Sequence, residues 1–302
     1  MKIKMIVKRN LAVFLNNKAV IFLTFASICV VVSLYVLFLR NFSLDVVEAG
    51  GVKKEYVSLF TDRMMISALF PVISTTTSFG ILHIYVRDTE TGIKRDFLTA
   101  PVSPFTLTLS CWISSAVVSA FFSLITLILS EIYFRYEYSN ALEPLTLLKL
   151  LITLTFSSVI CSGILLVFAN LLKTVGAFLT FANLYGTLAG FLSGSYLPYS
   201  FYPQWLKNVL FFYPPFQLAN LCRQFSLENI KEASFPQQSE LLNEFFKNMG
   251  ILLQWDNKNV SLKCQIIITL ISIALLITVF LLFNTKDKLS INIKNHIISR
   301  KH

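Results

Sequence analysis

Side chains that could carry out catalysis are sparse in this sequence. Neither a GxxxxGK[ST] nucleotide-binding loop nor an HExxH metal-binding pair occurs, and the three histidines are His83, His296 and His302. The five cysteines include no CxxC spacing, so neither a zinc site nor a disulfide framework is expected. The sequence therefore predicts no catalytic residue and no metal ligand.

One run of hydroxyl side chains offers a different chemistry, because hydroxyls can hydrogen-bond to a bound molecule. The run lies inside a long apolar segment and consists of Thr75, Thr76, Thr77 and Ser78. Such side chains commonly bond instead to carbonyls of their own helix. Both roles stay open at this point.

The elements that hold these residues are long apolar segments. The chain has 302 residues, of which 55% are hydrophobic and only 14% charged, against about 25% charged in soluble domains. Six runs of roughly 20 apolar residues can each cross about 30 Å of hydrocarbon. They cover residues 19–39, 64–86, 107–130, 150–172, 175–197 and 264–283. We therefore expect an all-α polytopic membrane protein with six transmembrane helices.

The charges indicate how these spans are oriented. The net charge is +10, and residues 1–18 and 284–302 together carry +9 of it. Basic residues that flank apolar spans mark the cytoplasmic side, whereas a nucleic-acid-binding protein would place them on a folded face. Both termini are therefore expected in the cytoplasm, with residues 19–283 as a single transmembrane domain and no nucleic-acid partner.

The loop 87–106 falls on the inner side in this topology. Asp88 or Thr89 is expected to cap a short helix there, and Glu90 and Lys94 have the i, i+4 spacing of a helical ion pair. Balanced charge argues against attraction to lipid headgroups and favours docking into a groove of a soluble partner.

The same loop has an apolar face and an abrupt end. Ile93 and Phe97 share one face, with Leu98 beside them, and Pro101 disfavours continuation of the helix. Pro104 suits the first turn of the next span. We expect a short amphipathic helix that ends before Pro101.

Prolines and aromatic residues dominate the start of the longest outer connection, residues 198–263. The residues that define this outer motif are Pro198, Pro203, Trp205, Leu206, Pro214, Pro215 and Arg223. The prolines predict breaks on either side of a short apolar helix, and hence a re-entrant helical hairpin before the last span. Further on, residues 241–253 show helical apolar spacing, which fits either a helix on the membrane surface or a packed outer mini-domain.

These segments carry a family resemblance. The inner pattern Arg-Asp-x-Glu-x-Gly-x-x-x-Asp-Phe-Leu-x-x-Pro, followed by the outer proline motif with Trp205 and Arg223, resembles the permease subunits of type-2 ABC exporters, including the multidrug and daunorubicin-resistance group. The usual inner motif has Thr and a leucine pair, where this chain has Ile93 and Phe97-Leu98. Span count, loop order and both motifs agree over about residues 1–285.

The resemblance implies that the inner loop is a coupling helix that contacts a separate ATPase subunit. The implied coupling residues are Asp88, Thr89, Glu90, Gly92, Ile93, Lys94, Arg95, Phe97, Leu98 and Pro101. It also implies an N-terminal connecting helix along the inner membrane surface, with the apolar face Ile3, Val7, Leu11 and Phe14. ATP and Mg²⁺ would bind to the ATPase and no cofactor to this chain. Two permeases in the lipid membrane and two ATPase subunits would form the exporter. Substrate would pass between the permeases, with spans two and five lining the route.

A stripe of small residues on span five could let another helix approach closely. It consists of Ala182, Gly186, Gly190 and Gly194. Its partner could be the second permease or a helix of the same chain.

The substrate is not specified by these patterns. A drug-like amphiphile, a peptide or a glycolipid would fit, as would a polysaccharide or teichoic-acid precursor. A polytopic membrane enzyme would need clustered His, Asp or Glu at one membrane face, and a structural membrane protein would not need the inner helix. The residue usage resembles that of a bacterial chain, which implies a bacterial cytoplasmic membrane.

Overall fold

The computed structural model describes residues 2–99, 102–235, 239–255 and 258–279. It contains six helices that are long and apolar enough to cross a membrane, which agrees with an all-α, multi-pass membrane protein. The six spans are Lys18–Ala49, α4 (Lys54–Glu90), α6 (Pro104–Tyr138), α7 (Pro144–Leu171), α8 (Val175–Leu192) and Leu262–Val279. The first span joins α2 (Lys18–Leu34), the π-helix η1 (Tyr35–Leu39) and α3 (Arg40–Ala49) without a break.

Several spans extend well beyond the predicted apolar runs. Residues 40–63 and 131–149 were expected to be loops, yet only residues 50–53 and 139–143 lie outside helices there. The reason is that Arg40 pairs with Asp62 and Arg63 pairs with Glu131 inside the bundle, whereas Asp45 and Glu48 lie exposed on the helix surface. Helices therefore continue through them.

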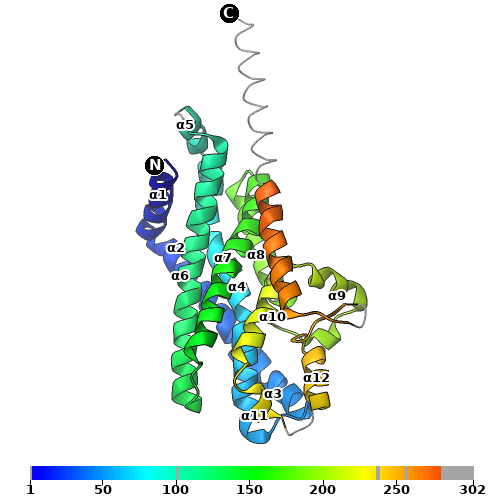
Figure 1. Ribbon diagram of the computed structural model, residues 1–302. Helices are drawn as coiled ribbons and strands as arrows, with labels where there is room; N and C mark the ends of the chain where they lie inside the picture. Colours follow the sequence, from blue (N-terminus) through cyan, green and yellow to red (C-terminus); the bar gives the residue numbers. More distant parts are fainter. Residues whose placement is uncertain (1, 100–101, 236–238, 256–257, 280–302) are drawn as a thin grey trace, which may run out of the picture.

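Helix α4 is the central element of the bundle (Figure 1), and it contacts α2, α6, α7, α8 and α10 (Pro214–Ser226). Of its most apolar stretch, 78% of residues are buried, against 22% in α8 and 17% in the last span. Buried serines of α6 let this helix approach closely. Ser119 Oγ donates to the carbonyl of Ser74 on α4 at 2.9 Å, and Ser115 Oγ to that of Ser78 at 3.3 Å.

The two ends of the bundle carry different elements (Figure 1). One end, called here the α5 end, holds α1 (Lys2–Asn16) and α5 (Ile93–Thr99). The opposite end, called the α12 end, holds α3, α11 (Lys231–Ser234) and α12 (Ser239–Asn248). Asn17 separates α1 from α2 and caps α2, because its side chain accepts from Val20 N at 3.2 Å.

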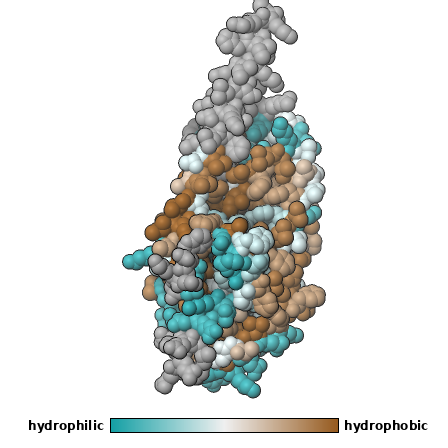
Figure 2. All heavy atoms as spheres, turned by 90° about the vertical axis from the view of Figure 1, so that its right-hand side faces the viewer, coloured by the Kyte–Doolittle hydropathy of each residue, from teal (hydrophilic) through white to brown (hydrophobic). Residues whose placement is uncertain are grey.

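The surface between the ends is apolar. Figure 2 shows a broad brown area across the upper middle of one face, with teal atoms gathered below it. Large exposed apolar side chains occur on the first span, on α6 and on the last span, for example Phe22, Phe121 and Ile267. This distribution is what helices that contact lipid require.

The outer motif forms the two predicted short helices. Helix α9 (Gln204–Phe211) follows Pro203, and α10 begins at Pro214, where a missing N–H costs nothing. The 3₁₀ turn η2 (Tyr199–Phe201) connects them to α8, which ends at Leu192 and is therefore shorter than predicted. The two helices differ in burial, because α10 packs against α4 and α7 whereas Trp205 of α9 is 67% exposed.

The amphipathic helix predicted near residue 241 is α12. Its buried Phe245 and Phe246 contact Phe60 of α4, with ring centroids 5.8 and 6.3 Å apart. The apolar face is thus packed against the bundle, which favours the packed cap over a helix on the membrane surface. A short antiparallel ladder, β1 (Gln254–Trp255) with β2 (Lys258–Asn259), then leads to the last span.

Candidate functional site at the α5 end

The turn between α4 and α5 depends on a glycine. Helix α4 runs through Glu90, and Gly92 follows with φ +85°, a left-handed conformation that favours glycine. Asp88 and Thr89 therefore lie in the last turn of α4, and the predicted N-cap for α5 at either residue is wrong. The Thr89 hydroxyl bonds instead to the carbonyl of Tyr85 at 2.9 Å.

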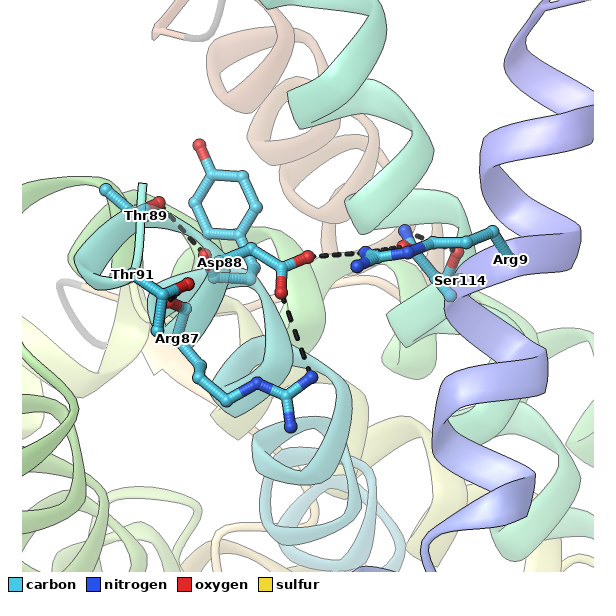
Figure 3. Close-up of polar contacts among 8 residues, drawn as sticks. Arg9, Arg87, Asp88, Thr89, Thr91 and Ser114 are labelled. Carbon is cyan, nitrogen blue, oxygen red and sulfur yellow. Dashed lines mark hydrogen bonds and ion pairs between the residues drawn. The ribbon is translucent and has the colours of Figure 1, made fainter. Parts of the chain in front are cut away.

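Asp88 connects the end of α4 to α1 through an ion pair. Figure 3 shows its carboxylate between Arg9 of α1 and Arg87 of its own helix. It accepts from Arg9 Nη1, and Arg87 Nη2 lies 3.8 Å from the other oxygen. The Asp88 side chain is only 9% exposed. Asp88 is therefore directed into the protein, where it fixes the turn against α1.

Glu90 connects the same turn to α8 through a hydrogen bond. Its exposed carboxylate accepts a hydrogen bond from the backbone N–H of Val175 at 2.9 Å. Val175 is the first residue of α8, where unpaired N–H groups and the helix dipole favour a negative charge. The predicted ion pair between Glu90 and Lys94 does not form, because the break at Gly92 separates the two residues.

Lys94 of α5 points back to the bundle. Its Nζ donates to the hydroxyl of Tyr85 at 2.9 Å and lies 4.9 Å from the centre of that ring. Tyr85 in turn donates to Asn170 Oδ1 on α7 at 2.6 Å. This chain of contacts connects α5 to α4 and α7.

The apolar side of α5 is partly covered by α1. Ile93 and Phe97 are half-buried, and the Arg9 guanidinium lies 5.3 Å from the centre of the Phe97 ring. The side chains of Arg95 and Leu98, and the whole of Pro101, lie outside the described part of the chain.

Helix α1 packs along α6 and α4, with Ile6, Asn10 and Phe14 as its buried residues. Of the predicted apolar face, Phe14 is buried, Val7 and Leu11 are half-buried and Ile3 is exposed. The buried face is thus rotated from the predicted one. The reason is the buried Asn10, whose side-chain amide donates to Ser114 Oγ on α6 at 3.5 Å. Hydropathy alone assigns this asparagine to the solvent-exposed face of α1.

The hydroxyl run of α4 is satisfied within the helix. Thr75 bonds to the carbonyl of Pro71 at 2.8 Å, Thr76 and Thr77 to that of Ile73 at 3.2 and 2.7 Å, and Ser78 to that of Ser74 at 2.7 Å. All but the half-buried Thr76 are buried. These four residues therefore fit the helix-bonding role, and buried α4 does not offer them to a route beside the bundle.

The small-residue stripe receives aromatic rings of the same chain. A Cβ on Gly186 would lie 3.7 Å from the Phe79 ring of α4, and one on Gly190 would overlap the Tyr196 ring. Ala182 is also buried. Gly194 lies beyond the end of α8 with φ +67°, so it ends the helix and is not part of its packing face.

Sequence reasoning missed a buried polar cluster near the α12 end, because it placed residues 40–63 in a loop. Asp62 of α4 is 1% exposed and accepts from the hydroxyls of three tyrosines and from one guanidinium. These donors are Tyr35 at 2.6 Å, Arg40 at 2.9 and 3.2 Å, Tyr133 at 3.0 Å and Tyr138 at 2.6 Å. The signal that α4 begins earlier was the apolar pair Leu59 and Phe60, which lies just before Thr61 and Asp62.

Arg63 forms a second buried pair beside this cluster. Its guanidinium is fully buried, donates to Glu131 of α6 at 2.9 Å and lies 4.2 Å from the centre of the Phe134 ring. It also donates to the side chain of Asn140 at 3.1 Å. Both clusters join α4 to α6 at this end.

The outer motif residues lie around α9 and α10. Pro203 and Trp205 are exposed, Pro198, Leu206 and Pro214 are half-buried, and Pro215 is buried. Arg223 of α10 is also buried and donates from Nη2 to the carbonyl of Gly194. Burial lowers the pKa of Arg223 to about 10, which leaves it charged at neutral pH.

A family comparison decides the relationship. The family described as ABC-2 type transporter matches residues 1–223, from α1 to Arg223 in α10. The chain belongs to the ABC-2 type transporter family. It is therefore the membrane permease component of an ABC transporter. Comparison with curated proteins and with solved structures found no match.

The match covers both segments on which the predicted relationship rests. The turn at Gly92 with α5, and the proline motif up to Arg223, fall inside residues 1–223 of this ABC-2 type transporter. The last span, Leu262–Val279, lies beyond the matched region.

Proposed function

We propose that this ABC-2 type transporter works as the membrane half of an ATP-driven exporter, with a separate ATPase chain docked at the α5 end. One observation carries the proposal. Helix α5 is a short helix on a glycine turn whose neighbouring residues bond to three long helices and to α1. A force applied to α5 therefore acts on the whole bundle.

Three contacts would transmit such a force. Asp88 forms an ion pair with Arg9 of α1, Glu90 accepts a hydrogen bond from the first N–H of α8, and Lys94 donates to the hydroxyl of Tyr85 on α4. Because Glu90 is exposed and its bond to Val175 is a single one, it is the contact that a docked partner would most readily change. ATP and Mg²⁺ bind to the partner in this proposal, and hydrolysis of the ATP moves α5.

The proposed substrate route runs beside α8 more than beside α4. Asn183 is exposed on α8 between Thr180 and Thr187, whose hydroxyls bond to carbonyls of their own helix. An amide that faces lipid is costly, so this side of α8 is better suited to a second permease copy or to a polar route between two copies. Because the apolar stretch of α4 is 78% buried, the proposal gives span five the larger share of the route that the resemblance assigned to spans two and five.

The α5 end is proposed to face the cytoplasm of a bacterial cell. Lys2, Lys4 and Lys8 of α1 are exposed at this end, and a basic segment beside the first span favours the cytoplasmic side. The exported substrate is proposed to be an amphiphile, a peptide or a glycolipid, with a polysaccharide precursor as the alternative.

A pull-down from mild detergent with a tag on this chain tests the proposal. We expect an ATP-binding chain to co-purify in one-to-one ratio and the eluate to hydrolyse ATP. The matched control is a variant with α5 residues 93–99 replaced by a Gly-Ser segment, which should insert normally and lose the partner. A tagged chain that purifies without an ATP-binding partner would favour a structural membrane protein or a membrane enzyme and would contradict the exporter role.

A further inference from the structure

A buried cation without a carboxylate partner lies near the α12 end. Arg223 is 3% exposed, and no described acidic side chain forms an ion pair with it. Its Nη2 donates to the carbonyl of Gly194, whereas its Nε has no hydrogen-bond partner among the described residues. A buried charge is costly unless an opposite charge and hydrogen bonds compensate it.

The other buried arginine of the same bundle shows the contrast. Arg63 has a carboxylate, an amide and an aromatic ring around its guanidinium. The titratable groups beside Arg223 are Tyr202 and Cys222, and burial raises the pKa of both, so neither supplies a negative charge at physiological pH. Within the described part of the chain, one buried arginine is therefore paired with a carboxylate and the other is not.

Arg223 lines a cavity at this place. The described walls come from α3, α4, the segment after α8, α10 and the residue that follows α12. They include Ser43, Val46, Met64, Leu197 and Met249, together with Arg223. The cavity has about 20 Å³ of free volume, which is room for one water-sized group.

The geometry points to a binding site for one anionic oxygen of a lipid-like amphiphile, with Arg223 and the Ser43 hydroxyl as its donors. A phosphate or carboxylate oxygen matches a guanidinium by charge and by hydrogen bonding. The other named walls are apolar, so a free hydrated anion would lose its water for few new bonds. In an anionic amphiphile, the charged oxygen would enter the cavity while the apolar chains stay outside, against the lipid-facing surface.

The surroundings of the cavity fit this occupant. Phe42, next to Ser43, is 40% exposed and its ring lies 6.3 Å from that of Phe201, which is 65% exposed. Both rings are apolar and exposed beside the cavity, where acyl chains can contact them. The proposal therefore places the acyl chains of the amphiphile against Phe42 and Phe201.

Thermal unfolding of the purified full chain in a maltoside detergent tests the site. The probes are phosphatidylglycerol, diacylglycerol with the same acyl chains, and inorganic phosphate. A ligand that binds only the folded state raises the unfolding midpoint, and we expect phosphatidylglycerol to raise it by at least about 2 °C while diacylglycerol does not. A shift with inorganic phosphate of the same size would assign the site to a free anion, and no shift with either anion would overturn it.

Two variants separate binding from folding. Arg223→Gln should remove the shift but also loses the bond to Gly194. Ser43→Val keeps Arg223, fills the cavity and removes the hydroxyl, so it should abolish the phosphatidylglycerol shift in a folded chain. Asn41→Val, on an exposed position of the same helix, is the matched control and should keep it. An unchanged shift in Ser43→Val would place the lipid elsewhere.

Discussion

The carboxylate of Asp62 accepts hydrogen bonds from three tyrosines and one arginine although it lies in a membrane-spanning helix. Removal of one partner from a buried charge cluster leaves the others unpaired, which typically costs about 3–5 kcal/mol. Asp62→Ala should therefore strongly lower the unfolding midpoint of the purified chain. Asp45→Ala, an exposed carboxylate on α3, is the control and should leave the midpoint unchanged.

The ion pair between Arg9 and Asp88 is a second contact between individual residues that can be tested. A double-mutant cycle with Arg9→Ala and Asp88→Ala should give a coupling of about 1–2 kcal/mol in unfolding experiments, because the carboxylate is 9% exposed. The exposed pair Lys54 and Glu48, 3.7 Å apart, supplies the control cycle. Its coupling free energy should be only about 0.2–0.5 kcal/mol. Equal coupling in the two cycles would mean that Asp88 does not fix α1 to α4.

At the scale of elements, the turn at Gly92 decides whether α5 keeps its position. A Cβ there meets nothing within 4 Å, so a substitution acts through the positive φ alone. Gly92→Val should uncouple transport from ATP hydrolysis and leave membrane insertion intact, because a β-branched residue disfavours this conformation by about 1–2 kcal/mol. Gly92→Asn, which tolerates it better, should retain most transport.

Glu90→Ala tests the neighbouring contact in the same assay. It removes the acceptor from the first N–H of α8, and we expect it to lower transport more than ATP hydrolysis. Combined with Gly92→Val it should abolish transport in proteoliposomes. Normal transport by the double variant would contradict a role of this turn in coupling.

Helix α9 contributes to stability through one side only. Trp205 is 67% exposed, so Trp205→Ala should change the unfolding free energy by less than about 0.5 kcal/mol and leave ATPase docking intact. Leu210 on the same helix is fully buried, and Leu210→Ala should cost about 2–5 kcal/mol. Loss of docking in Trp205→Ala would contradict the placement of the docking site at α5, away from α9.

Local sequence patterns predicted the elements well. Apolar run length predicted all six spans, the prolines predicted the breaks around α9, and the helix at 93–99 followed from its apolar spacing. What they missed depends on distant residues. Asp62 and Arg63 look like loop residues until Tyr138 and Glu131, some 70 positions away, are seen to pair with them. The Glu90–Lys94 pair failed for the local reason that Gly92 breaks the helix between them.

At the scale of the whole molecule, α4 connects the two ends. Its 37 residues span about 55 Å, which exceeds the hydrocarbon core of a bilayer. It carries Asp62 and Arg63 near the α12 end and Asp88 and Glu90 at the α5 end. Because α2, α6, α7, α8 and α10, among other helices, pack on it, movement of α5 is expected to shift the bundle as a unit rather than a single span.

The central claim is that an ATP-binding chain docks at the α5 end, and site-specific photo-crosslinking tests it most directly. A photoreactive residue would replace exposed Asp96 of α5 in one variant and, in the control, exposed Trp205 of α9, which lies away from α5 (Figure 1). After irradiation of whole cells, we predict a crosslink to an ATP-binding chain from position 96 and none from position 205. A crosslink from position 205 alone, or from neither, would contradict the account.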